Sequence, residues 1–220
     1  MKISSHAPSF LPWAGYWNKV ASADLFLLTG EGYYNGQAYQ NRVTFDGALA
    51  IIPLDKATKH GPLRKVKIAA ELAVPTLAQR IHHTYRGPRF PYARRLEPLI
   101  ETMHMMGVQH NLMRVNIQLH HVVAGMLNIR TETRVDTAPT QAKTPTEHLA
   151  ALIVRYDEDP VYYAGPGAMT YLSLQPPSFP VQVQKFREPI CRDSIVQVIA
   201  QEPDPEDYVR TCATWGPLES

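Results

Sequence analysis

The sequence predicts an α/β fold, a single domain with a mixed, mostly parallel sheet flanked by helices. Short apolar runs typical of buried strands alternate along the chain with segments of helical periodicity. The 220 residues suit one domain, and 45% hydrophobic with 19% charged residues is the composition of an ordinary globular protein. We therefore expect one domain over residues 1–220, with a helical middle segment at about 75–128.

The first part of the chain predicts strands around one early helix. A strand is expected at residues 2–5 and a buried one at 24–28. Between them, Pro12 suits the first position of a helix that should end near Ala21. Residues of this helix recur at helical spacing, namely Trp13, Tyr16, Trp17 and Val20. Two later apolar runs predict strands, at residues 49–54 and 66–69.

The middle of the chain predicts three helices. They are expected at residues 75–85, 92–104 and 109–127, with a break at Gly87-Pro88 after the first. The third has a continuous apolar face, formed by Leu112, Val115, Leu119, Val122, Val123 and Met126. A half-exposed strand at 130–135 and a polar linker at 136–143 should follow.

The last third predicts three helices and two strands. Thr144-Pro145-Thr146-Glu147 is a capping box, which should begin a helix that contains Leu149, Leu152 and Ile153. Strands are expected at 161–163 and 181–186, with a turn at Gly165-Pro166-Gly167 after the first and no strand after the second. The last helices should be one capped by Asp193 or Ser194 that runs to Ile199, and one at 204–213.

Charge is distributed unevenly although the net charge is only +2. From Lys56 to Arg95 there are ten lysines and arginines against Glu71 alone, which gives +9. Residues 201–220 hold five acidic residues against Arg210, which gives −4. Such segregation favours a polyanionic or phosphorylated partner for the middle segment, and the alternative is a solvated basic face with no ligand.

The cysteines and the hydropathy favour a reducing cytoplasm and no membrane. Cys191 and Cys212 form neither a disulfide framework nor a metal set. Met1-Lys2 leads directly into polar residues, so no signal peptide is expected. No uninterrupted apolar run approaches the roughly 18 residues of a membrane span. Cys191 lies beside Arg192 and could be a nucleophile, but we favour an inert thiol.

His6 is the first candidate for chemistry, because it follows a predicted strand and precedes a predicted helix. An imidazole there could accept a proton or bind a phosphate, although a single histidine is often only structural. Asn41 and Arg42 could clamp an anion, or they could form a salt bridge at a strand edge.

Residues 82–90 mix basic and aromatic groups more densely than any other stretch. His82, Tyr85 and Arg86 could contact phosphate and stack on a base. The alternative is an exposed helix end whose cations complement the helix dipole. No zinc spacing and no G-x-G-x-x-G or Walker motif is present, so we expect no metal and no cofactor.

One pattern spans much of the chain. It begins His6-x-Pro8-x-x-Leu11-Pro12-Trp13-x-Gly15-Tyr16 and continues with Ala23-Asp24 and Asn41-Arg42. It resembles the WbqC-like family, whose members typically open with I-H-Q-P-N-Y-L-P-W-x-G-Y and have a later N-R. Further matches are 82–85 with Pro88 and Phe90, Tyr163-x-Gly165-Pro166-Gly167 with Tyr171-Leu172, and 193–195. Ala7 replaces the usual glutamine, and Gly30-Glu31 stands where an acidic pair is expected.

The resemblance implies a single WbqC-like domain and two functional settings. Bacterial relatives belong to surface-polysaccharide (O-antigen) biosynthesis, where a transferase would act on a nucleotide sugar. Phage relatives resemble amino-acid:DNA transferases that build hypermodified thymidines. There an amino acid's amine displaces phosphate or pyrophosphate from the 5-methylene of a uracil in DNA. The basic segment favours the DNA reaction, because a sugar nucleotide needs only a few cations.

We therefore expect a transferase that joins glycine, or another free amino acid, to double-stranded DNA carrying a phosphorylated 5-hydroxymethyl-uracil. A phage-encoded protein would work in the host cytoplasm. His6 is the expected base, with Asn41 and Arg42 beside it, and Arg42, Arg86 and Lys67 would neutralise the leaving oxygens. Trp13, Tyr16 or Tyr85 would stack on a flipped base, and His82 would also bind substrate. The expected DNA contacts are Lys56, Lys59, Arg64, Lys65, Arg89, Arg94 and Arg95.

Overall fold

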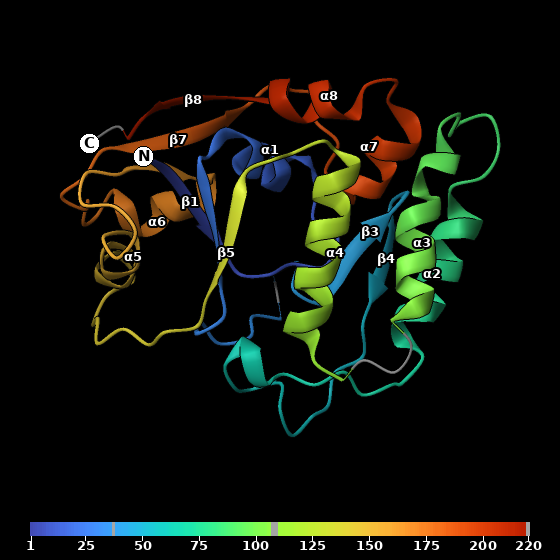
Figure 1. Ribbon diagram of the computed structural model, residues 1–220, viewed down its shortest axis with the longest axis horizontal. Coiled ribbons are helices and arrows are strands. Elements are labelled where there is room, and N and C mark those ends of the chain that lie inside the picture. Colours follow the sequence, from blue (N-terminus) through green and yellow to red (C-terminus); the bar gives the residue numbers. More distant parts are fainter. Residues whose placement is uncertain (37, 107–109, 219–220) are drawn as a thin grey trace.

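The computed structural model describes residues 1–36, 38–106 and 110–218, and its centre is a six-stranded sheet (Figure 1). The strands lie in the order β5-β2-β1-β6-β7-β8. Neighbouring strands are parallel except for β7 and β8, which are antiparallel. Their bounds are β1 Lys2–His6, β2 Leu25–Thr29, β5 Glu132–Asp136, β6 Val161–Ala164, β7 Val181–Phe186 and β8 Ala213–Pro217. The predicted fold class is therefore confirmed.

Successive strands are added first on one side of β1 and then on the other. From β1 it proceeds outward through β2 to β5, and it then returns to the other side of β1 to add β6, β7 and β8. The connections that leave the carboxyl ends of β1 and β6 therefore go in opposite directions, to β2 and to β7, which opens a crevice at the carboxyl ends of these two strands.

Helices cover both faces of the sheet. The larger core includes side chains of α1 Ala14–Ser22, α4 Leu112–Met126, α7 Ile195–Gln201 and α8 Pro205–Thr211 against one face, where Phe26 and Leu28 point. The smaller core packs α5 Pro145–Ile153 and α6 Met169–Leu172 against the other face, where Leu25 and Leu27 point. The alternation along β2 follows from the two-residue period of a strand.

The segment between β2 and α4 extends the larger core away from the sheet. It contains a hairpin of β3 Arg42–Phe45 and β4 Ala48–Ile51, the 3-10 helices η1 Leu63–Lys65 and η2 Ala93–Leu96, and the helices α2 Ala73–Thr84 and α3 Glu97–Met105. Figure 1 shows α2 and α3 side by side beyond the hairpin, at the right of the molecule. The helices α2, α3 and α4 occupy the range of about 75–128 in which the sequence predicts a helical middle segment.

Several predicted elements are confirmed, and four need correction. The early helix begins at Ala14, and Trp13 rather than Pro12 precedes it. At 66–69 there is no strand, only single bridges from Lys67 to Asn111 and from Ile68 to Leu54. The apolar run at 49–54 is a strand only as far as Ile51. Residues 181–186 are not the last strand, since β8 follows, and the expected start of α4 at Gln109 lies outside the described residues.

The strand β3 was missed because Arg42–Phe45 alternates buried and half-buried residues over only four positions. The capping box of α5 is confirmed, with the Thr144 hydroxyl accepting from the Glu147 N–H and the Glu147 carboxylate accepting from the Thr144 N–H. Ser194 caps α7, and its hydroxyl accepts from the Val196 N–H.

Gly15 is a close-packed position in α1. A Cβ atom at this position would lie 2.5 Å from the Trp13 ring and 2.8 Å from the Phe186 ring, and these two rings pack against each other. We expect Gly15→Ala to lower the free energy of unfolding by about 1–3 kcal/mol, because the rings must move. Gly125→Ala in α4 is the control, since a Cβ atom there meets open space. It should be neutral or stabilise by up to about 1 kcal/mol in urea unfolding, and equal effects of the two changes would contradict the packing argument.

Candidate active site

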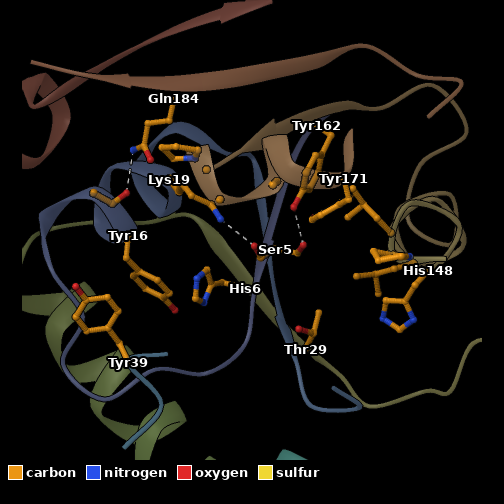
Figure 2. Close-up of a pocket in the computed structure, with 18 of the residues that line it drawn as sticks. Ser5, His6, Tyr16, Lys19, Thr29, Tyr39, His148, Tyr162, Tyr171 and Gln184 are labelled. Carbon is orange, nitrogen blue, oxygen red and sulfur yellow. Dashed lines mark hydrogen bonds between the residues drawn. The ribbon is translucent and has the colours of Figure 1, made fainter. Parts of the chain in front are cut away.

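A cavity of about 530 Å³ lies at the carboxyl ends of β1 and β6. Ser5 and His6 at the end of β1 border it, and so does the Gly165–Gly167 turn that follows β6. Since Ser5 and His6 are neighbours in a strand, they point to opposite faces, and the cavity extends around the sheet edge from α1 to α5. Figure 2 shows Tyr16 and Tyr39 at one end, His148 at the other, and His6, Lys19 and Ser5 between them.

His6 is a neutral imidazole with one ring nitrogen available. Its Nδ1 lies 2.8 Å from the Ala7 carbonyl oxygen, so Nδ1 carries the proton and donates it to that bond. The Nε2 atom then has a lone pair and no hydrogen-bond partner among the described residues. Burial and the nearby Lys19 ammonium lower the pKa of His6 to about 4, which keeps the ring uncharged near pH 7.

An aromatic cluster supports the His6 ring from behind. The Tyr16 ring meets it edge to face, with centroids 5.2 Å apart. The Tyr16 hydroxyl lies 3.0 Å from Nδ1 of His120, and the His120 ring stacks on Trp17 and Phe26. Burial lowers the pKa of His120 to about 3, so this second imidazole is also neutral. The cluster therefore fixes the orientation of His6 without adding charge.

The cavity wall contains one cation close to His6. The Lys19 ammonium donates to the Ser5 carbonyl oxygen at 3.0 Å, and burial lowers its pKa to about 8. No aspartate or glutamate lines the cavity within the part of the chain that the structure describes. The remaining polar groups are hydroxyls, amides and His148, while Leu149 and Leu152 of α5 supply an apolar wall.

Hydroxyl groups converge near the end of β1. The hydroxyls of Ser5 and Tyr162 lie 2.9 Å apart, and Tyr171 lines the same side of the cavity. His148 is hydrogen-bonded to the Thr140 hydroxyl, which connects α5 to the loop before it. A smaller hollow with Glu31, Gly32 and Thr140 in its wall shares His148 with the cavity.

Only three of the predicted site residues line this cavity, namely His6, Trp13 and Tyr16. Trp13 is partly exposed, and the Arg192 guanidinium lies 4.9 Å from its ring. Tyr16 is only 4% exposed, so most of its ring faces the protein. Neither of these rings stands free on the surface.

Asn41 and Arg42 are not among the residues that line the cavity of His6. Asn41 is buried and already bonded, because it donates to the Ile52 carbonyl and accepts from the Tyr34 hydroxyl at 2.7 Å. The Nε atom of Arg42 is buried with no hydrogen-bond partner among the described residues. The Asn41 amide thus hydrogen-bonds to residues on both sides of the hairpin. This role is structural, whereas the sequence suggested an anion clamp.

The basic and aromatic stretch at 82–90 lies elsewhere. His82, Tyr85, Arg86 and Arg94 border a separate hollow of about 210 Å³ between α2 and η2. The Tyr85 ring is 2% exposed and packs against Phe45 and Phe90, so in this structure it cannot stack on an extruded base. Lys67 borders a third hollow together with Lys56.

Several of the expected DNA contacts already have partners. Arg64 pairs with Glu31 at 2.6 Å, and Arg89 pairs with Asp46 at 3.0 Å. Arg95 donates to two carbonyl oxygens, those of Glu202 and Pro203. By contrast, Lys56, Lys65 and Arg94 are exposed and form no ion pair among the described residues, and Lys59 is half-buried.

One part of the basic segment lies near the cavity. The N–H groups of Leu63 and Arg64 in η1 donate to the carbonyls of Gly32 and Gly30, which follow β2. Since β2 runs parallel to β1, this contact places η1 beyond the carboxyl edge of the sheet. The cations of 80–95 lie instead with α2 and α3, on the far side of the hairpin (Figure 1).

The sequence reasoning missed Lys19, Ser5, Tyr162 and His148. The burial of Lys19 could have been predicted, since a lysine three residues after Tyr16 lies on the inward side of the predicted helix. The others belong to segments whose place in the sheet order depends on tertiary packing. Burial raises the pKa of both cysteine thiols, which agrees with an inert Cys191.

Two further observations concern metal ligands and membrane-spanning helices. Across residues 1–36, 38–106 and 110–218, no group of three or more His, Cys, Asp or Glu side chains is placed to hold a metal ion. Over the same residues, no helix is both long and apolar enough to cross a membrane.

Comparisons with known proteins give one match. A model of the WbqC-like protein family matches residues 7–187, which is most of the chain. No curated protein and no solved structure matches the chain. The matched range includes the aromatic cluster, Lys19 and the Gly165–Gly167 turn.

The two neutral histidines predict acid sensitivity. Their folded pKa values of about 4 and about 3 lie below the unfolded value of 6.5, so the unfolded chain takes up protons first as the pH falls. The free energy of unfolding therefore falls as the pH drops below 6.5, by about 2 kcal/mol for each histidine at pH 5. Urea unfolding measured between pH 7.5 and pH 5 tests this.

A variant and a control separate the contribution of His120. His120→Gln should flatten the pH dependence by about one proton, whereas the control His104→Gln, at an exposed position on α3, should not. A wild-type stability that is flat over this range would show that neither imidazole is held neutral.

Proposed function

The chain belongs to the WbqC-like protein family, and we propose that it is a transferase that joins an amine to a carbon bearing a phosphorylated leaving group. The family match is consistent with transferase-type function. The observation that supports the proposal most directly is His6, a neutral imidazole whose Nε2 has no hydrogen-bond partner among the described residues, in the cavity at the point of the sheet where the strand order reverses.

The proposed reaction is a displacement at carbon. The amine nitrogen forms a bond to the methylene carbon, the carbon–oxygen bond breaks, and phosphate or pyrophosphate departs with the bonding electron pair. The proton that the nitrogen loses goes to Nε2 of His6. Because the pKa of His6 is about 4 without ligand, the amine must arrive uncharged. An anionic substrate beside His6 would raise that pKa toward the useful range.

We propose DNA carrying phosphorylated 5-hydroxymethyl-uracil as the acceptor and glycine as the amine. A base extruded from the duplex needs an enclosed pocket, and about 530 Å³ is within the range of small-ligand sites. The support for DNA is the position of η1, which places exposed Lys65 beyond the same edge of the sheet as the cavity. Cations at that edge can bind the phosphates that flank the extruded base.

A second candidate is transfer from a nucleotide sugar in surface-polysaccharide synthesis. It is favoured by the pairing of Arg64 and Arg89 with carboxylates and of Arg95 with carbonyls, which leaves fewer cations for a long polyanion than the sequence count suggests. A nucleotide sugar would also need no protein surface outside the cavity.

Transfer should depend on His6. We expect His6→Asn to lower the rate of amino-acid transfer at least about a hundredfold, because the proton acceptor is lost. The assay incubates the protein with phosphomethyl-uracil DNA and glycine, and measures the released nucleosides by mass. His121→Asn is the control and should keep the wild-type rate, since this side chain is exposed on α4. A His6→Asn enzyme as fast as wild type would remove His6 from the mechanism.

DNA binding should be electrostatic and should involve the η1 edge. The logarithm of the affinity for a duplex should fall linearly with the logarithm of salt concentration, with a slope near −0.9 for each phosphate contacted. Lys65→Ala should reduce that slope by about one unit, and Lys2→Ala, which removes an exposed lysine at the opposite, amino end of β1, should not. If the wild type ignores duplex DNA at low salt but a nucleotide sugar raises its melting temperature, the second candidate replaces the first.

A further inference from the structure

Lys19 is a buried cation that the fold itself does not require. Its side chain lies on α1, is 5% exposed, and reaches the end of β1 to donate to the Ser5 carbonyl oxygen at 3.0 Å. That single bond uses one of the three donors of the ammonium. An apolar side chain could fill the same volume without the cost of removing a charge from water.

The counter-charge for Lys19 is missing from the described residues. None of the ion pairs there includes it, and the cavity wall has no carboxylate in that part of the chain. Burial is the cause of its lowered pKa, with no acidic neighbour opposing it. A buried ammonium that faces a cavity and has no protein anion is suited to an anion supplied by a ligand.

The surroundings of Lys19 leave room for such an anion. The Gly165 backbone packs on the lysine, since a Cβ atom there would lie 3.4 Å from its Cδ and 3.7 Å from its Nζ. A Cβ atom at Gly167 would meet nothing within 4 Å, so this part of the turn is open to a ligand. The hydroxyls of Ser5 and Tyr162 are bonded to each other, which leaves one O–H of the pair to donate to a ligand on the neighbouring side.

We propose that Lys19 binds the phosphoryl group of the substrate, in the corner of the cavity between the end of β1 and the Gly165–Gly167 turn. The identity of the anion as a phosphoryl group rests on the proposed function. A tetrahedral phosphoryl group offers oxygens to the ammonium and to the hydroxyls at once, whereas a planar carboxylate offers only two. When the carbon–oxygen bond breaks, the negative charge develops beside an ammonium that keeps its proton.

Inorganic pyrophosphate and inorganic phosphate are the probes, titrated separately into the full chain in a calorimeter at pH 7. We expect the wild type to bind pyrophosphate, Lys19→Met to bind it at least about tenfold more weakly, and Lys19→Arg to stay within a few-fold of wild type. Lys2→Met removes an exposed lysine at the amino end of β1, away from the cavity, and should bind like the wild type. A Lys19→Met protein that binds as tightly as wild type, or a wild type that binds neither probe at millimolar concentration, overturns the proposal.

A second measurement needs no variant. Acetic anhydride should acetylate Lys19 of the wild type more slowly in the presence of pyrophosphate, and acetate, a carboxylate with no amine to consume the reagent, should not protect it. Protection by acetate instead of pyrophosphate would assign the corner to a carboxylate and would overturn the phosphoryl assignment. These measurements use neither DNA nor a transfer reaction. Pyrophosphate binding without any amino-acid transfer would therefore keep the Lys19 site and reject the proposed function.

Discussion

The reversal of strand order at β1 is the constraint on which the rest of the structure depends. Because β2 and β6 flank β1 in parallel, the segments that follow all three strands leave from one edge of the sheet. Residues that are about 160 positions apart in the chain, such as Ser5 and Tyr162, meet there as a hydrogen-bonded pair. The site therefore exists only once the central strand has neighbours on both sides.

Burial lowers the pKa of both His6 and Lys19 at the centre of the site. His6 therefore stays neutral well below the usual pH of 6.5, whereas Lys19, with a pKa of about 8, is still a cation at pH 7 although burial disfavours its charge. The rings of Tyr16, Trp17 and His120 fill the space behind β1 on the side of His6. A rigid aromatic support keeps the imidazole oriented, and the absence of carboxylates from the described cavity wall leaves the lysine's charge for a ligand.

The sequence was informative about local structure and about one end of the site. Periodicity and caps identify most helices, and His6 was expected at the strand end where it is found. The sequence could not show that Arg42, Arg86 and Lys67 lie away from the cavity of His6, because their positions depend on where the hairpin and α2 pack. Aromatic residues near a site motif also do not distinguish a ligand-stacking ring from a packed one, as Tyr85 illustrates. Strands as short as β3 leave too few residues for their alternation to be recognised.

The antiparallel strand β8 has a consequence for the ends of the described chain. In its pairing with β7, Pro217 lies opposite Gln182, near the beginning of that strand, and Met1 precedes β1 at the same amino edge of the sheet. In the sheet order, β6 and β7 lie between β1 and β8. A fluorescent protein or an immobilisation tag joined at either end would thus be anchored on the side remote from the cavity.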